Sequence, residues 1–323
     1  MKKRSSFLTG FIAMLVAAGL LSSAGTAQAA LVYSANFASG TISSWDTSNL
    51  RAGATTILSG ITGPIGVATD SSGNIYVSST GNGGEIRKYT QGGSFLTSLA
   101  GTGFTFALAF DASDNLYYNS VTLGGTYKTT TSLTSGSLFA SGNSPTGMFI
   151  DSSGNVSVMN VNGGEFPYVD TYNSGGGLIG GLDNLGSFYP MDNSHGVSRD
   201  AAGNYYVSNR GNSLDGNYYI SKWDSAGSLV NGTYINTGYD AYGMLVDGST
   251  LFVASHGTGS ILYYDLANSG AYVCEFSVGA SPTYMNFATT APAAVPEPGT
   301  WAAAALLAGG AAFMRWRKRA NVS

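Results

Sequence analysis

From residue 30 to residue 290, short segments of alternating apolar and polar residues are separated by turns rich in Gly, Asn, Asp and Ser. Such alternation is typical of half-buried β-strands, because successive side chains of a strand point to opposite faces of its sheet. The region has no sustained 3.6-residue period of apolar positions, which an amphipathic helix requires. The pattern therefore predicts an all-β domain.

One phrase recurs within this region, in the form Pro-x-Gly-apolar-x-x-Asp-x-x-Gly-Asn-apolar-Tyr-Val. Clear copies cover residues 64–78, 145–158 and 195–208, weaker ones cover 106–118 and 242–253, and the opening alone recurs at 282–287. The anchoring positions 70, 111, 151, 200, 247 and 288 are 41, 40, 49, 47 and 41 residues apart. This period fits a four-stranded propeller blade and is too long for a leucine-rich repeat.

Each copy has the chemistry of two strands joined by a tight turn. An Asp such as Asp70 can accept hydrogen bonds from backbone amides two residues later, and a Gly such as Gly73 can adopt a positive φ. A further strand, such as residues 85–89, follows a Gly-rich loop. Each copy therefore predicts an innermost strand and a second strand that are joined by a hairpin turn, followed by the outer strands of a blade.

The last copy lacks its continuation, and the beginning of the domain supplies it. Residues 31–37 and 39–46 have the pattern of second and third blade strands with no first strand before them. Pairing of residues 31–37 with 282–287 would close the ring and leave no open sheet edge inside it. We therefore predict a six-bladed β-propeller closed by the N-terminal strands, over residues 30–290.

Residues 1–29 have a different character. A basic start is followed by an apolar stretch and by the small-residue triplet Ala27-Gln28-Ala29. This order predicts a secretory signal peptide that is cleaved before Ala30. The alternative is an uncleaved anchor helix, for which the apolar stretch is short.

The C-terminal residues form a second segment outside the repeats. Residues 291–299 are a Pro-rich linker, and residues 300–319 are predicted to form an apolar helix that ends in a basic cluster. The ordered elements are Pro296, Glu297 and Pro298, then the helix, then Arg315, Arg317, Lys318 and Arg319. With the basic cluster in the cytoplasm, the helix would place the body outside it.

This tripartite tail resembles the PEP-CTERM sorting signal of exopolysaccharide-producing Gram-negative bacteria. The resemblance implies partners in the export machinery and an exosortase-type sorting enzyme that cleaves at the Pro-Glu-Pro motif. It also implies anchoring in the cytoplasmic membrane through the helix, on the periplasmic side, before processing to the cell surface or extracellular matrix. An ordinary single-pass C-terminal anchor is the alternative.

Composition excludes several classes of function. Residues 30–294 contain seven basic and seventeen acidic residues, a formal charge of −10, so no nucleic-acid partner is expected. Cys274 is the only cysteine, which excludes an intramolecular disulfide and a cysteine-cluster metal site.

The repeated phrase resembles the NHL repeat and its relatives, which include regucalcin-like gluconolactonases and streptogramin lyases. For the former, the resemblance implies carboxylates and amides around a central calcium. The first strands here instead have Ala68, Ala109, Phe149, Ser198 and Leu245 where an axial ligand would point. Propellers host many unrelated functions, so the resemblance predicts the architecture more firmly than an activity.

Candidate site residues lie where the last strand of one blade leads into the next blade, and in the loop between second and third strands. They are His195, His256, Asp192, Asp240, Asn209 and Arg210. Both histidines of the chain are in this set and belong to adjacent predicted blades. With one of the aspartates they could bind Ca²⁺ or another divalent metal, or one histidine could act as a general base. Alternatively, both histidines simply occupy ordinary repeat and loop positions.

Tyrosine occurs 20 times, partly in pairs such as Tyr117-Tyr118 and Tyr205-Tyr206. Exposed tyrosines could stack on sugar rings, whereas the alternative is packing between blades. No catalytic motif is recognisable. We therefore expect a non-enzymatic, exported binding or structural module without a cofactor, with extracellular polysaccharide as a candidate ligand. The alternative is a metal-dependent, lactonase-like hydrolase or lyase with its site on the loop face.

Overall fold

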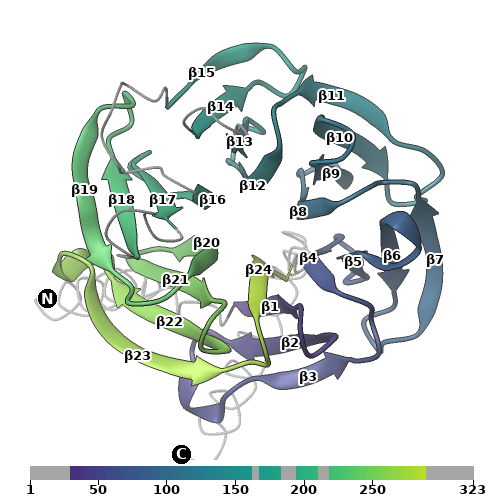
Figure 1. Ribbon diagram of the computed structural model, residues 1–323, viewed down its shortest axis with the longest axis horizontal. Helices are drawn as coiled ribbons and strands as arrows, with labels where there is room; N and C mark the ends of the chain where they lie inside the picture. The colour runs from purple at the N-terminus through teal and green to yellow at the C-terminus, as the bar shows by residue number, and fades with distance from the viewer. Residues whose placement is uncertain (1–29, 162–166, 183–193, 210–217, 289–323) are drawn as a thin grey trace, which may run out of the picture.

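The computed structural model describes residues 30–161, 167–182, 194–209 and 218–288. Their strands form six four-stranded antiparallel sheets, which are arranged as blades around a central axis (Figure 1). The first strand of each blade lies next to the axis, and the fourth lies at the perimeter. The predicted six-bladed propeller is therefore confirmed.

The strands are numbered in chain order, and blade 6 contains both ends of the ring. Blade 1 contains β4 (Pro64–Thr69), β5 (Ile75–Ser79), β6 (Glu85–Tyr89) and β7 (Phe95–Ala100), and blade 2 contains β8 (Thr105–Phe110), β9 (Asn115–Ser120), β10 (Gly125–Thr130) and β11 (Ser137–Ser141). Blade 3 contains β12 (Pro145–Ile150), β13 (Val156–Asn160), β14 (Tyr168–Tyr172) and β15 (Leu178–Leu182), and blade 4 contains β16 (Ser194–Arg199), β17 (Tyr205–Asn209), β18 (Tyr219–Trp223) and β19 (Leu229–Asn236). Blade 5 contains β20 (Ala241–Asp247), β21 (Thr250–Ser255), β22 (Ser260–Asp265) and β23 (Ala271–Ser277), and blade 6 combines β24 (Pro282–Phe287) with β1 (Leu31–Asn36), β2 (Thr41–Asp46) and β3 (Thr55–Leu58).

The ring is closed by pairing between the two ends of the body. Strand β24 runs antiparallel to β1, with Val32 opposite Phe287. The hydroxyl of Thr283 also donates a hydrogen bond of 2.6 Å to the carbonyl of Ile65, which ties blade 6 to blade 1. The closure predicted from the half-repeat after residue 30 is therefore confirmed.

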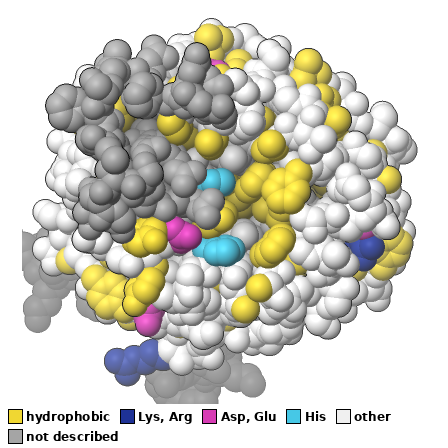
Figure 2. All heavy atoms as spheres, viewed as in Figure 1, with side chains coloured by type: hydrophobic (Ala, Val, Ile, Leu, Met, Phe, Trp, Pro, Cys, Tyr) yellow, Lys and Arg dark blue, Asp and Glu magenta, His cyan; other side chains and the backbone are white. Residues whose placement is uncertain are grey.

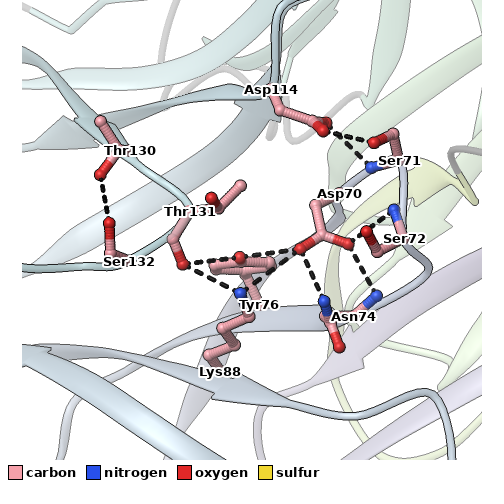
Figure 3. Close-up of polar contacts among 10 residues, drawn as sticks. All are labelled: Asp70, Ser71, Ser72, Asn74, Tyr76, Lys88, Asp114, Thr130, Thr131 and Ser132. Atoms are coloured by element: carbon pink, nitrogen blue, oxygen red, sulfur yellow. Dashed lines mark hydrogen bonds and ion pairs between the residues drawn. The ribbon is translucent and has the colours of Figure 1, made fainter.

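The repeated Asp-x-x-Gly-Asn phrase forms the turn between first and second strands. In blade 1, the carboxylate of Asp70 accepts hydrogen bonds of 2.8 Å from the backbone and the side chain of Asn74, and one of 2.9 Å from the hydroxyl of Tyr76 (Figure 3). The ammonium of Lys88 lies 3.5 Å from the same carboxylate. The turn recurs at Asp111, Asp151 and Asp200, each of which accepts a backbone hydrogen bond from the Asn four residues later.

These turns also connect neighbouring blades. The backbone amide of Ser71 donates a 2.9 Å hydrogen bond to Asp114 in the turn of blade 2, and Lys88 donates one of 2.9 Å to the carbonyl of Thr131 (Figure 3). The Asp70 turn therefore stabilises its own hairpin, and the residues around it connect blade 1 to blade 2.

Paired tyrosines pack inside the propeller. Tyr117, Tyr118, Tyr205 and Tyr206 are all buried, so neither member of these pairs is a platform for sugar. The alternative, packing between blades, accounts for these two pairs. Any sugar-binding surface must come from other aromatic residues.

The two segments for which sorting is predicted lie outside the described residues. These are the predicted signal peptide of residues 1–29 and the predicted C-terminal linker and helix, with Pro296, Glu297, Pro298 and the basic cluster. Across residues 30–288, as far as they are described, the structure contains no helix long and apolar enough to cross a membrane.

The acidic turns make stability depend on pH. Burial alone would raise the pKa of Asp70, but hydrogen bonds from Asn74 and Tyr76 and the charge of Lys88 outweigh it and hold this pKa below its usual value. The pKa values of Asp111 and Asp200 are lowered in the same way, chiefly by Asn115 and Asn204 against the effect of burial. A lowered folded-state pKa stabilises the fold above the unfolded-state pKa, near 4, and this contribution disappears as the pH falls further.

We therefore predict that the free energy of unfolding decreases as the pH falls below about 4. Replacement Asp70→Ala should lower this free energy at neutral pH by about 2 kcal/mol, because it leaves buried donors without their acceptor. Urea denaturation followed by circular dichroism measures both effects. The matched control is Asp247→Ala, at the exposed equivalent position in blade 5. Equal losses for the two variants would contradict the role assigned to the Asp70 turn.

Candidate ligand site on the propeller axis

The second residue of the innermost strand carries a ring in three of the six blades. These residues are Phe106 in β8, His195 in β16 and Tyr242 in β20. Because the blades are related by rotation about one axis, equivalent positions lie at the same height along it. Rings from separate blades therefore converge near the axis.

The converging rings form a continuous series. The ring centroid of His195 lies 5.7 Å from that of Phe106 and 5.0 Å from that of Tyr242. Tyr242 in turn stacks on His256, at 4.6 Å and an interplanar angle of 27°. Phe104, just before β8, extends the series at 5.1 Å from Phe106. We call these residues, together with Tyr284, the axial ring cluster.

Tyr284 crosses between blades on the axis. Its hydroxyl donates a 2.7 Å hydrogen bond to the carbonyl of His195, two blades away, and its ring centroid lies 6.0 Å from that of Phe106. It occupies the third position of β24, where four other innermost strands have glycine. The bond fixes blade 6 against blade 4.

Those four glycines allow neighbouring strands to approach closely. Ideal Cβ atoms built on Gly66, Gly147, Gly196 and Gly243 would lie 2.1, 2.5, 2.1 and 2.8 Å from the carbonyl oxygens of Phe106, His195, Tyr242 and Thr283, respectively. Each contact joins the third position of one strand to the second position of a neighbouring innermost strand. The absence of a side chain at the third position therefore lets ring-bearing strands crowd around the axis.

Small polar side chains on the second strands reinforce this contact. In blade 4, the hydroxyl of Ser208 accepts a 2.8 Å hydrogen bond from the amide of Gly196 and donates one of 2.9 Å to the carbonyl of Tyr242. The same arrangement joins Ser78 to Gly66 and Phe106, with the longer donation at 3.4 Å. The backbone that positions the rings is thus fixed from a neighbouring blade.

The cluster combines buried and accessible rings. His195 and Tyr242 are each 9% exposed, whereas Phe104 is 41% exposed and Phe106 and His256 are half-buried. Figure 2 shows the histidine side chains close together near the middle of one face, with hydrophobic side chains and an acidic side chain beside them. The backbone of Asp240, which is half-buried, accepts a 3.0 Å hydrogen bond from the amide of His256.

The structure treats the predicted site residues differently. It brings both His195 and His256 within 5.0 Å of Tyr242, measured between ring centroids, with Asp240 next to His256. Asn209 is instead buried at the end of β17, where its side chain accepts a 2.9 Å hydrogen bond from Ser194. Asp192 and Arg210 lie outside the described residues.

Phe106, Tyr242 and Tyr284 were not among the residues predicted for the site. A signal for Phe106 and Tyr242 was present in the sequence. The second position of the innermost strand has an aromatic or histidine side chain in three of the repeat copies. Axial ligands were instead expected three residues later, at the fifth position of each innermost strand.

The axis also contains a cavity of about 160 Å³, lined by the innermost strands of all six blades. Tyr284 contributes to its wall, together with apolar side chains such as Met148, Ile150 and Phe287. The cavity shows that the strands leave space on the axis.

The donor set does not fit a calcium or zinc centre. The second positions of the innermost strands hold Ile65, Phe106, Thr146, His195, Tyr242 and Thr283. Hard cations need several oxygen ligands, and zinc needs three or four nitrogen, sulfur or carboxylate ligands. Within the described part of the chain, no group of three or more His, Cys, Asp or Glu side chains is placed to hold a metal ion.

Comparison with known proteins identifies the fold and no family. No protein-family model and no curated protein matches the sequence. A chain of a nidogen/laminin complex is 17% identical, with a TM-score of 0.64, covering 81% of this chain and 99% of its own. A putative 6-phosphogluconolactonase from Bacteroides fragilis NCTC 9343 is 13% identical, with a TM-score of 0.60 and coverage of 82% and 99%.

Regucalcin, a calcium-binding protein from Agrobacterium tumefaciens str. C58, is 16% identical with a TM-score of 0.54, covering 68% of this chain and 76% of its own. Similarity at these identities extends to the fold alone, so the chain shares a propeller architecture with proteins of different functions.

We predict that Gly196→Ala severely destabilises the protein, by about 3 kcal/mol or more, because the new methyl group would meet the carbonyl of Tyr242. The matched control is Gly257→Ala, since a Cβ there has no neighbour within 4 Å. Thermal unfolding of both variants provides the measurement. Similar unfolding temperatures would show that the glycine contact does not constrain the axis.

Proposed function

We propose that the chain is an exported, non-enzymatic binding module whose axial ring cluster binds a sugar ring of an extracellular polysaccharide. The observation that supports this proposal is the cluster of ring side chains on the axis, in which Tyr242 stacks on His256 at 4.6 Å and the other pairs meet tilted or edge-on. Typical ligand sites combine aromatic walls with a few polar groups that fix orientation.

The chemistry of the cluster suits a neutral sugar. The C–H faces of a pyranose are apolar and pack on aromatic rings, while its hydroxyl groups need hydrogen-bond partners. Half-buried His256 and Phe106 offer ring surface, and half-buried Asp240, whose backbone carbonyl accepts the amide of His256, adds a polar residue beside them. A neutral ligand also suits the body, because its formal charge of −10 would repel a strongly anionic polymer.

Sorting belongs to the same proposal. The signal peptide pattern of residues 1–29 and the Pro296-Glu297-Pro298 tail support export, followed by attachment at the cell surface or in the extracellular matrix. A binding module in that location would meet polysaccharide continuously.

The alternative is a metal-dependent, lactonase-like hydrolase. Its support is the propeller shared with a putative lactonase and with regucalcin, at identities that show only the fold. The ring cluster favours binding, because the described residues contain no group of three or more His, Cys, Asp or Glu side chains that could hold a metal ion.

We predict that the protein binds neutral oligosaccharides on a glycan array and that Tyr242→Ala weakens this binding at least about tenfold, because His256 loses the buried ring on which it stacks. Isothermal titration calorimetry with the best oligosaccharide measures the change. The control is Tyr272→Ala, which removes an exposed tyrosine from β23, far from the axis.

Two outcomes would contradict this proposal. One is an equal loss of affinity in both variants, which would place the sugar elsewhere. The other is lactone hydrolysis that requires added Ca²⁺ and disappears in His195→Ala or His256→Ala, which would establish the hydrolase instead.

A further inference from the structure

The accessible rings of the axial ring cluster lie at its two ends. At the blade 2 end, Phe104 is 41% exposed and Phe106 is half-buried. At the blade 5 end, His256 is half-buried, and between the ends His195 and Tyr242 are buried. Blades 2 and 5 face each other across the axis, since their innermost strands β8 and β20 lie on opposite sides of it (Figure 1). A ligand that contacts both ends must therefore cross the axis.

Tyr239 adds an exposed aromatic ring at the blade 5 end. It lies in the connection between β19 and β20, is 51% exposed, and directly precedes Asp240 in the sequence. The backbone of Asp240 accepts the hydrogen bond from the amide of His256, so this connection lies against the turn that carries His256. The two ends therefore have the same composition, which is an exposed aromatic side chain and a half-buried ring.

The exposed apolar residues of the connections all lie on this face. Among the described residues, the exposed large hydrophobic side chains outside the fourth strands are Phe37, Phe104, Leu123 and Tyr239. Each lies between a fourth strand and the next first strand, or between a second and a third strand. In antiparallel blades, both kinds of connection lie at the end of the axis where the innermost strands begin. Figure 2 shows hydrophobic side chains around the histidines on one face. The connections at the opposite end, as far as they are described, have no such exposed residue.

Hydrogen bonds hold the backbone of both exposed aromatic residues. The amide of Phe104 donates a 2.9 Å hydrogen bond to the hydroxyl of Thr122, and its carbonyl accepts one of 3.0 Å from the amide of Val121. The carbonyl of Tyr239 accepts a 2.8 Å hydrogen bond from the hydroxyl of Thr237. Residues that are fixed before binding lose little conformational entropy when a ligand binds, so both rings are suited to contact a ligand.

The spacing of the rings indicates the size of the ligand. Successive ring centroids from Phe106 through His195 and Tyr242 to His256 are 5.7, 5.0 and 4.6 Å apart. One pyranose unit of an extended chain is comparable in length with one of these steps. A single sugar can therefore contact one end of the series, whereas a chain of several sugars can contact both.

We infer that this face binds an internal segment of several consecutive sugars, which crosses the axis from Phe104 and Phe106 to His256 and Tyr239. The inference rests on the proposed function, because it takes a neutral polysaccharide as the ligand. An exposed ring at each end lets the chain continue in both directions. Two contacts made by one ligand also raise its affinity, because the second contact forms within the complex. The module is therefore selective for long chains over free sugars and chain ends.

The test is isothermal titration calorimetry of the full chain with one to six linked sugars of the neutral type that binds best on the glycan array. We expect the affinity to rise at least about tenfold from the disaccharide to the hexasaccharide. Phe104→Ala and Tyr239→Ala should each weaken hexasaccharide binding about fivefold, and the double variant about 25-fold, because the two rings act at separate ends. The control, Tyr272→Ala, removes an exposed tyrosine of β23 and should bind as wild type.

The outcomes separate this inference from the proposed function. Equal affinity for the disaccharide and the hexasaccharide would overturn the inference alone, as would hexasaccharide binding that neither Phe104→Ala nor Tyr239→Ala weakens. A hexasaccharide that binds more weakly after borohydride reduction of its terminal sugar would show that a chain end is bound instead of an internal segment. Absence of binding to every neutral sugar would overturn the proposed function together with the inference.

Discussion

Contact between neighbouring innermost strands is closest where a glycine of one blade faces the carbonyl of a ring-bearing residue in another. At Gly196 an added Cβ would lie 2.1 Å from the carbonyl of Tyr242, so the backbones touch without an intervening side chain. This approach brings rings of separate blades within 6 Å of one another near the axis. Without it, His195 and His256 could not both contact the ring of Tyr242. The candidate site is therefore a consequence of how the blades pack.

Closure of the ring keeps this packing in place. The pairing of β24 with β1 joins segments about 250 residues apart in sequence, and β24 also contributes Tyr284 to the axis. The strand that closes the ring is thus the one that fixes blade 6 against blade 4 within the site. On the turns, Asp70 and its equivalents fix each hairpin, and Ser71 with Asp114 connects two of them. The proposed binding site and the stability of the fold consequently depend on the same contacts between blades.

The sequence was informative about architecture because each blade repeats local chemistry. The Asp-x-x-Gly-Asn turn and the two-residue alternation are set within a few residues of one another, so blade number and closure could be predicted. The site was harder, because which second-position rings touch depends on the angle between blades. His195 and His256 were identified, but Tyr242, whose ring contacts both, was not, and Asn209 proved to be a buried strand residue.

The most direct measurement is a crystal structure of the protein with a bound neutral oligosaccharide. We predict one sugar ring against Phe106 or His256, the half-buried rings near the propeller axis, with a hydroxyl group near Asp240. A sugar held only at the fourth strands of the blades or at the acidic turns would contradict this prediction. A metal ion coordinated on the axis instead of a sugar would also contradict it.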